Sequence, residues 1–155
     1  DEELMNQILK DVDTVMHFAA LKDAGESMSD PALYLNHNII ATLKLIRICV
    51  SNSIGKFIFS SSAAVYGVPN YLPLDENHTL NPINYYGYSK LCIENNLNWF
   101  NNLTNIKVAS LRYFNAAGYD VKQRINKKEK KISNLFPMIM KVANGTRKIL
   151  DIYGN

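Results

Sequence analysis

The sequence predicts an α/β protein with a doubly wound, mainly parallel sheet. Two observations favour this fold. Apolar runs of strand length alternate with helical patterns of ten or more residues, and the 155 residues are 47% apolar and 20% charged, as in an ordinary globular domain. Such alternation implies right-handed βαβ crossovers, with helices on both faces of a parallel sheet. Ligands of these folds bind beyond the carboxyl ends of the strands.

The first half of the chain carries the clearest helical pattern. Residues 3–11 suit a short helix, and the apolar run 13–19 suits a strand. A long helix is expected from Pro31 to about Ser53, because proline is favoured in a first turn. Its apolar positions recur every three or four residues, at Leu35, Ile39, Leu43, Ile46 and Val50. The apolar run 57–62 then predicts the second strand.

The second half continues the alternation after a turn-rich segment that contains Pro69, Pro73 and Pro82. Further elements are expected in this order: a helix at 84–103, a strand at 106–112, a helix at 133–144 that ends at Gly145, and a strand at 149–153. The segments at the carboxyl ends of the strands are therefore 19–30, 60–70 and 113–120.

Charge is concentrated in one segment. Residues 122–131 hold six basic side chains and one acidic one, a local charge of +5, whereas the whole chain has a net charge of +3. The remainder is therefore at −2. Nucleic-acid binding would need basic residues spread over a face, with base-reading side chains nearby. We interpret the segment as a solvated loop, and expect neither a nucleic-acid partner nor a membrane span, since no run approaches about 18 apolar residues.

Cysteine and histidine usage indicates neither disulfides nor a metal. Cys49 and Cys92 lie in separate apolar patterns without a CxxC, which favours buried free thiols in a reducing compartment such as the cytoplasm. The three histidines, His17, His37 and His78, lack metal-ligand spacing.

The glycines exclude one motif. They stand at positions 25, 55, 67, 87, 118, 145 and 154, too far apart for a GxGxxG or a phosphate loop. If the chain belongs to a dinucleotide fold, we expect the first βα unit to be absent from these residues. The sequence is therefore interpreted as an excerpt of a longer protein.

Tyr86 and Lys90 form a candidate catalytic pair. They are four residues apart on the second long helix, on the same stripe as Ile93 and Leu97, so both should turn toward the sheet. A nearby cation favours the phenolate, which could act as a general base. The alternative is an interfacial tyrosine beside a snorkelling lysine, since nine Tyr and 13 Lys give about one such spacing by chance.

Ser60, Ser61 and Ser62 end an apolar strand one βα unit earlier, where a hydroxyl would face the ligand crevice. Backbone capping at a strand end is the alternative explanation. Together with Tyr86 and Lys90, such a serine could hold one substrate hydroxyl from two sides.

Four colinear segments carry a family resemblance: VMHFAALKDAGES (15–27), FIFSSSAAVYG (57–67), YYGYSK (85–90) and LRYFNAAG (111–118). They resemble the extended short-chain dehydrogenases/reductases, and most closely their UDP-glucose 4-epimerase branch, to which the LK and GES of the first segment point. The resemblance implies a Rossmann-like fold that lacks its first βα unit or units and whose C-terminal substrate domain is truncated. Residues 1–112 would be a partial NAD-binding domain with the catalytic helix, and 113–155 an incomplete continuation into the substrate-binding region.

The resemblance assigns residues to three roles. The catalytic residues would be Ser62, Tyr86 and Lys90. NAD would contact these three together with Phe18, Ala19, Ala20, Leu21, Lys22, Asn38 and Phe114. The substrate would contact Lys22, Ser62, Tyr86, Asn115, Asn134, Leu135, Asp151, Ile152 and Tyr153, although Asn134 could also cap its helix and Tyr153 could be an edge-strand aromatic.

The activity implied by the resemblance is epimerisation at C4 of a UDP-hexose by transient hydride transfer to NAD, through a 4-keto sugar, in a cytoplasmic enzyme that is a homodimer at full length. The related dehydratases and decarboxylases use acidic residues just after the strand-end hydroxyl, where this chain has Ala63 and Ala64. Two alternatives stay open: a non-catalytic fragment or binding module, because the glycine loop is missing, and an epimerase of N-acetylated UDP-sugars.

Overall fold

The computed structural model describes residues 1–118, 120–122, 124 and 135–151. The chain divides into two compact units, Asp1–Tyr113 and Phe114–Asn155, and each is described by itself. Within the described residues no helix is both long enough and apolar enough to cross a membrane.

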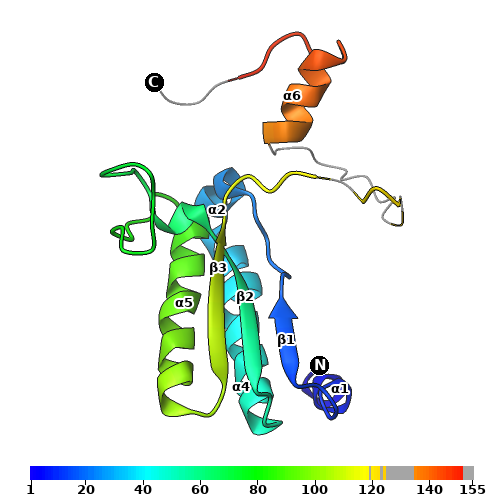
Figure 1. Ribbon diagram of the computed structural model, residues 1–155, viewed down its shortest axis with the longest axis vertical. Helices are drawn as coiled ribbons and strands as arrows, with labels where there is room; N and C mark the ends of the chain where they lie inside the picture. Colours follow the sequence, from blue (N-terminus) through cyan, green and yellow to red (C-terminus); the bar gives the residue numbers. More distant parts are fainter. Residues whose placement is uncertain (119, 123, 125–134, 152–155) are drawn as a thin grey trace. The chain divides into compact units, whose positions relative to one another are not determined.

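A three-stranded parallel sheet forms the centre of the first unit (Figure 1). Its strands are β1 (Thr14–His17), β2 (Lys56–Ser62) and β3 (Lys107–Tyr113), in the order β1-β2-β3. The register places Val15 beside Phe57 and Phe57 beside Val108. The prediction of a parallel α/β sheet is confirmed, because alternating strands and helices leave each strand running in the same direction.

The helices lie close to their predicted positions. Their bounds are α1 Glu2–Ile8, α2 Ala24–Ser29, α3 Pro31–Tyr34, the π-helical η1 Leu35–Ile40, α4 Ala41–Ser51, the 3₁₀ turn η2 Ala63–Val65, α5 Tyr85–Leu103 and, in the second unit, α6 Leu135–Ala143. Side chains cap the starts of the two long helical segments. Asp30 accepts the N–H of Leu33, with Pro31 in the first turn, and Asn84 accepts the N–H of Gly87.

The core lies between one face of the sheet and the helices α4 and α5. Phe57 and Phe59 alternate inward on β2 and are at most 1% exposed. They pack in one cluster with residues of both helices, among them Ile46, Cys49, Ile93 and Leu97. The opposite face is open within the first unit, where Met16 is 55% exposed. The covered face therefore determines which side chains of β2 and α5 can meet.

Four expectations differ from the structure. The long helix contains the π-helical turn η1, and the short helix α2 was not predicted. Cys92 is only partly buried, although both cysteines are free. The expected strand at 149–153 is wrong for residues 149–151, which pair with no described strand; 152 and 153 lie outside the described residues. Most of the basic segment 122–131 also lies outside them.

Candidate active site

The end of β2 places three serines in three environments. The backbone carbonyl of Ser60 accepts a hydrogen bond from Lys90, and the hydroxyl of the buried Ser61 donates to Glu94. Ser62 is half-buried, and its Oγ accepts the N–H of Ala64 at 3.2 Å. The capping role considered for this serine is thus present. Because the hydroxyl accepts in that bond, its own hydrogen stays available to a ligand.

Lys90 is a buried cation at the carboxyl ends of the strands. Its side chain comes from α5, is 3% exposed as a residue, and donates from Nζ to the Ser60 carbonyl at 2.8 Å. The Nζ atom also lies 4.8 Å from the centroid of the Phe59 ring and 5.8 Å from that of Tyr86. Burial lowers the pKa of Lys90 to about 8. The predicted proximity of Lys90 and Tyr86 is confirmed.

Tyr86 stands in the first turn of α5, next to the turn η2 that follows Ser62. Gly87 makes this approach possible, because a Cβ atom there would lie 2.4 Å from the carbonyl oxygen of Ala64. The phenol ring of Tyr86 is half-buried and meets the ring of Tyr34 edge-on, with 6.5 Å between centroids. Within the described part of the chain its hydroxyl makes no hydrogen bond, so it is available to a substrate.

Asn38 holds the loop that follows β1. Its side chain accepts the N–H of Leu21 at 2.9 Å and donates to the Leu21 carbonyl at 3.0 Å, and it is 1% exposed. It also donates to Ser89 on α5 at 3.4 Å. Asn38 lies in the π-helical turn η1, and such turns are frequent at functional sites. The amide predicted to approach the cofactor thus also fixes the backbone of the loop 18–22.

The remaining residues predicted in that loop are largely solvent-accessible. Phe18 is 56% exposed, and its ring centroid lies 6.3 Å from that of Tyr113 at the end of β3. Ala19, Ala20 and Lys22 are exposed, and Leu21 is half-buried. All of them follow the carboxyl end of β1. Figure 1 shows the loop after β1, the end of β2 and the start of α5 at the same end of the sheet, and the bond from Lys90 to Ser60 joins α5 to the end of β2.

A buried ion pair beneath these residues was not predicted. Glu94 is 4% exposed and accepts from Nη2 of Arg112 at 2.8 Å as well as from Ser61. Arg112 also donates from Nη1 to the Tyr66 hydroxyl at 3.1 Å, and the bonds to Glu94 raise the pKa of Arg112 above its ordinary value. A signal was present in the sequence, since Glu94 continues the Tyr86-Lys90 stripe of α5 by one further turn.

The second unit holds the remaining candidates, and their positions relative to the first unit are not described. Phe114, which follows β3, is 61% exposed, and Asn115 is exposed too. Leu135 begins α6 and is 46% exposed, and Asp151 forms an ion pair with Arg147. Asn134, Ile152 and Tyr153 lie outside the described residues. Whether these side chains join the site stays a prediction.

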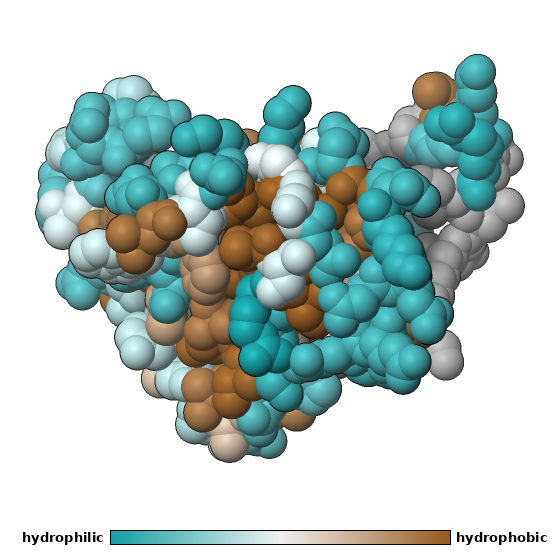
Figure 2. All heavy atoms as spheres, turned by 90° about the horizontal axis from the view of Figure 1, so that it is seen from below, coloured by the Kyte–Doolittle hydropathy of each residue, from teal (hydrophilic) through white to brown (hydrophobic). Residues whose placement is uncertain are grey.

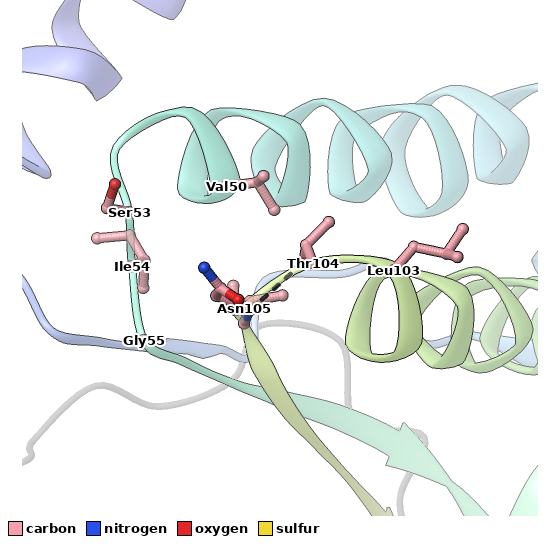
Figure 3. Close-up of a pocket in the computed structure, with 8 residues that line it drawn as sticks. Val50, Ser53, Ile54, Gly55, Leu103, Thr104 and Asn105 are labelled. Atoms are coloured by element: carbon pink, nitrogen blue, oxygen red, sulfur yellow. Dashed lines mark hydrogen bonds between the residues drawn. The ribbon is translucent and has the colours of Figure 1, made fainter.

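A pocket of about 410 Å³ lies at the opposite end of the sheet (Figure 3). Its lining residues come from the ends of α4 and α5 and from the segments that lead into β2 and β3: Val50, Ser53, Ile54, Gly55, Leu103, Thr104, Asn105 and Ile106. Parallel sheets bind ligands at the carboxyl ends of their strands, so this pocket is not the candidate active site. Among the residues described, no three acidic, His or Cys side chains gather as a metal site.

A buried lysine beside an accessible phenol and a strand-end serine, on a parallel α/β sheet, is an arrangement for proton transfer from a hydroxyl group. The family model of the NAD dependent epimerase/dehydratase family matches residues 1–155, and the chain belongs to this family. A UDP-glucose 4-epimerase of Halalkalibacterium halodurans is 38% identical over 157 aligned positions, which cover 100% of this chain and 47% of the relative. The chain thus spans about half the length of the curated relatives it matches.

Solved structures agree with this assignment and with a Rossmann-like fold. A UDP-glucose 4-epimerase of Brucella ovis in complex with NAD has a TM-score of 0.91 at 36% identity, covering 99% of this chain and 48% of that one. The enzyme of Bifidobacterium longum, in complex with NAD⁺ and UDP, has a TM-score of 0.88 at 38% identity, covering 99% and 48%. A UDP-N-acetylglucosamine 4-epimerase of Methanobrevibacter ruminantium has a TM-score of 0.77 at 36% identity, covering 91% and 44%.

Proposed function

We propose that the full-length protein carrying this chain is an NAD-dependent epimerase that inverts C4 of a UDP-hexose, interconverting UDP-galactose and UDP-glucose. The observation that carries the proposal is the buried Lys90 ammonium beside Tyr86, at the carboxyl ends of a parallel sheet. Family membership and the named activities of the relatives support it.

The side chains have complementary roles in this proposal. Tyr86, as phenolate, takes the proton from the sugar 4-hydroxyl, and Ser62 donates its free hydroxyl hydrogen to the same oxygen. Lys90 places a positive charge 5.8 Å from the Tyr86 ring centroid, which favours the phenolate. NAD, when bound, supplies the reversible oxidation of C4 to a 4-keto sugar.

The residues present fit such a cofactor at one position. An ammonium has three N–H donors, and within the described residues Lys90 uses one of them, for the Ser60 carbonyl. A buried cation with two donors remaining is suited to hydroxyl groups such as those of a ribose. Asn38 keeps the backbone of the loop 18–22 in place, where Phe18, Ala19, Ala20, Leu21 and Lys22 would meet the cofactor.

We extend the proposal to the two parts of the chain. The residues of 1–112 would bind NAD and carry the catalytic helix, and those of 113–155 would begin the binding region for the nucleotide sugar. Phe114 would contact NAD. Asn115, Asn134, Leu135, Asp151, Ile152 and Tyr153 would contact the UDP-sugar. The cytoplasm fits the free Cys49 and Cys92, since disulfides form in oxidising compartments.

The direct test is an assay of the full-length protein with UDP-galactose, with bound NAD measured after denaturation. Tyr86→Phe should lower kcat by a factor of about 100 or more, because general-base catalysis contributes about that much. Tyr88→Phe is the matched control, since Tyr88 lies on the same helix and is 50% exposed. Near-normal turnover in Tyr86→Phe would refute the base.

The same assay decides between the alternatives. A UDP-N-acetylglucosamine epimerase would turn over that substrate faster than UDP-glucose, an outcome favoured by the Methanobrevibacter ruminantium relative. A full-length protein with neither activity nor bound NAD would support a binding module and overturn the proposal.

We also propose a homodimer built on the outer face of α5. Trp99 and Leu103 are 66% and 75% exposed and are four residues apart, hence on the same side of this helix. Figure 2 shows an apolar band between hydrophilic regions on the face seen from below, and the interface proposed here rests on Trp99 and Leu103 alone. Large exposed apolar groups such as Trp99 and Leu103 mark protein interfaces.

Trp99→Glu should shift the full-length protein toward monomer in light scattering, and an unchanged mass would refute this interface.

A further inference from the structure

Ser27 is a buried residue that connects two elements far apart in the sequence. It lies in α2, is 0% exposed, and donates from Oγ to the Ala24 carbonyl at 2.6 Å. The same oxygen accepts the backbone N–H of Tyr86 at 2.9 Å. The donated hydrogen and one of the two lone pairs of the hydroxyl are therefore directed at backbone groups.

The N–H of Tyr86 needs this acceptor. It belongs to the first turn of α5, where backbone N–H groups have no partner within their own helix. Asn84 accepts the N–H of Gly87 from the same turn. The acceptor for Tyr86 comes from α2, so the placement of α2 influences where the first turn of α5 lies.

Tyr34 fixes α2 and also touches Tyr86. Its hydroxyl lies 2.6 Å from the Asp23 carbonyl and 3.0 Å from a carboxylate oxygen of Glu26, and its residue is 0% exposed. Its ring meets the Tyr86 ring edge-on at an interplanar angle of 82°. Asp23, the N-cap of α2, directly follows Lys22. The helix thus lies between the loop proposed to meet cofactor and substrate and the proposed base.

We propose that Ser27 is a positioning residue, which holds the first turn of α5 so that the phenol of Tyr86 keeps its place relative to the loop 18–22. The inference rests on the proposed function, since it assigns Ser27 to the orientation of the base. Because Ser27 contacts the backbone of the proposed base, we expect a larger effect on the geometry of proton transfer than on the uptake of the sugar nucleotide.

The test compares Ser27→Ala with Ser29→Ala in the full-length protein. Ser29 lies on the same helix, is exposed, and makes only a 3.5 Å contact to the Gly25 carbonyl in the described structure. Ser27→Ala should lower kcat by a factor of about 10 or more and leave KM within about threefold, since a small misplacement of a catalytic group costs turnover. Ser29→Ala should keep both constants. Rates are normalised to bound NAD.

Hydrogen exchange gives a second measurement that does not depend on activity. Ser27→Ala should speed deuterium uptake in the peptide Tyr85–Tyr88, because the Tyr86 N–H loses its acceptor. If the alanine variant does not fold, Ser27→Cys, of similar size and with a weak acceptor, takes its place. Unchanged kcat and unchanged uptake would overturn the inference.

The outcomes separate the inference from the proposed function. An inactive Tyr86→Phe with a fully active Ser27→Ala would refute only the role of Ser27. An active Tyr86→Phe would refute the base itself. A fall in kcat for Ser27→Ala that is matched by an equal loss of bound NAD would indicate a structural role, and would also overturn the inference.

Discussion

The Lys90 ammonium is buried, and a buried environment disfavours a charged group. Burial lowers its pKa from the ordinary 10.5 to about 8. The native protein therefore releases a proton at a lower pH than the unfolded chain does. Between about pH 8 and pH 10.5 the unfolded state binds more protons, so folding stability should rise with pH in this window. Below pH 8 the full cost of burying the ammonium is present.

We expect this effect in urea unfolding of the full-length protein at pH 7.5 and 9.5. Over this interval, the free energy of unfolding of the wild type should rise by on the order of 1–2 kcal/mol more than that of Lys90→Met. Cys49 and Tyr34, whose pKa values burial raises to about 11 and about 12, oppose the gain equally in both proteins. Parallel pH profiles for wild type and variant would contradict the low pKa.

At Gly87, helix propensity and packing have opposite effects on stability. In a helix, replacing glycine by alanine usually adds about 1 kcal/mol of stability. Here the new Cβ would lie 2.4 Å from the Ala64 carbonyl oxygen, so α5 and η2 would have to separate. We expect Gly87→Ala to lower both the melting temperature and kcat.

Gly25 provides the matched control for this substitution. A Cβ there would have its nearest neighbour at 3.4 Å, and the residue lies in the exposed first turn of α2. Gly25→Ala should keep the melting temperature within about 3 °C of wild type. Equal melting temperatures for the two variants would show that the approach of α5 to η2 is not tight.

Among the elements, α5 is joined to the sheet by polar as well as apolar contacts. Glu94 and Arg112 pair α5 with β3, and Ser61 joins the same carboxylate from β2. The ion pair is largely desolvated, with side-chain exposures of 5% and 19%. Removing one partner of such a pair leaves a buried charge, which costs about 3–5 kcal/mol.

Arg112→Met should therefore reduce the free energy of unfolding by about that amount in urea denaturation. The exposed pair Arg47–Glu2 is the comparison, since Arg47→Met should cost about 1 kcal/mol or less. A double variant, Glu94→Leu with Arg112→Met, should recover part of the loss because no charge stays unpaired. If Arg112→Met and Arg47→Met lower the free energy of unfolding by equally small amounts, the buried pair does not anchor α5.

The elements also show which sequence signals were sufficient to predict helices and strands. Period and length identified the strands and long helices, because their apolar stripes face one core. The helix α2 has only six residues, AGESMS, without an apolar stripe, although Asp23 and Glu26 have the spacing of a capping box. For residues 149–151 an apolar pattern did not suffice, because a strand needs a partner to pair with and a pattern does not supply one.

Across the whole molecule, the residues proposed to be catalytic were easier to predict than those proposed to position them. Tyr86, Lys90 and the serine run 60–62 were found from their residue types and their positions on neighbouring elements, and the family resemblance singled out Ser62. Ser27 and Asn38 make hydrogen bonds to backbone groups distant in the sequence, and no spacing rule predicts such contacts; Asn38 was named only through the family resemblance, as a cofactor contact. The chain belongs to its family over all of its residues and spans about half the length of its relatives, so its sequence predicts only the cofactor and substrate contacts of that half.

The π-helical turn Leu35–Ile40 fixes the length of the long helix as well as its shape. One residue rotates an α-helix by about 100°, so an extra residue in a turn changes the direction of every side chain that precedes it. The segment after the turn directs Ile46 into the core, and the turn itself directs Asn38 to the loop after β1. Deleting a single residue there would leave a regular helix, but it would turn Asn38 away from Leu21 and Ile39 away from the core cluster. The chain length between Tyr34 and Ala41 is therefore constrained by the loop after β1 as well as by the core.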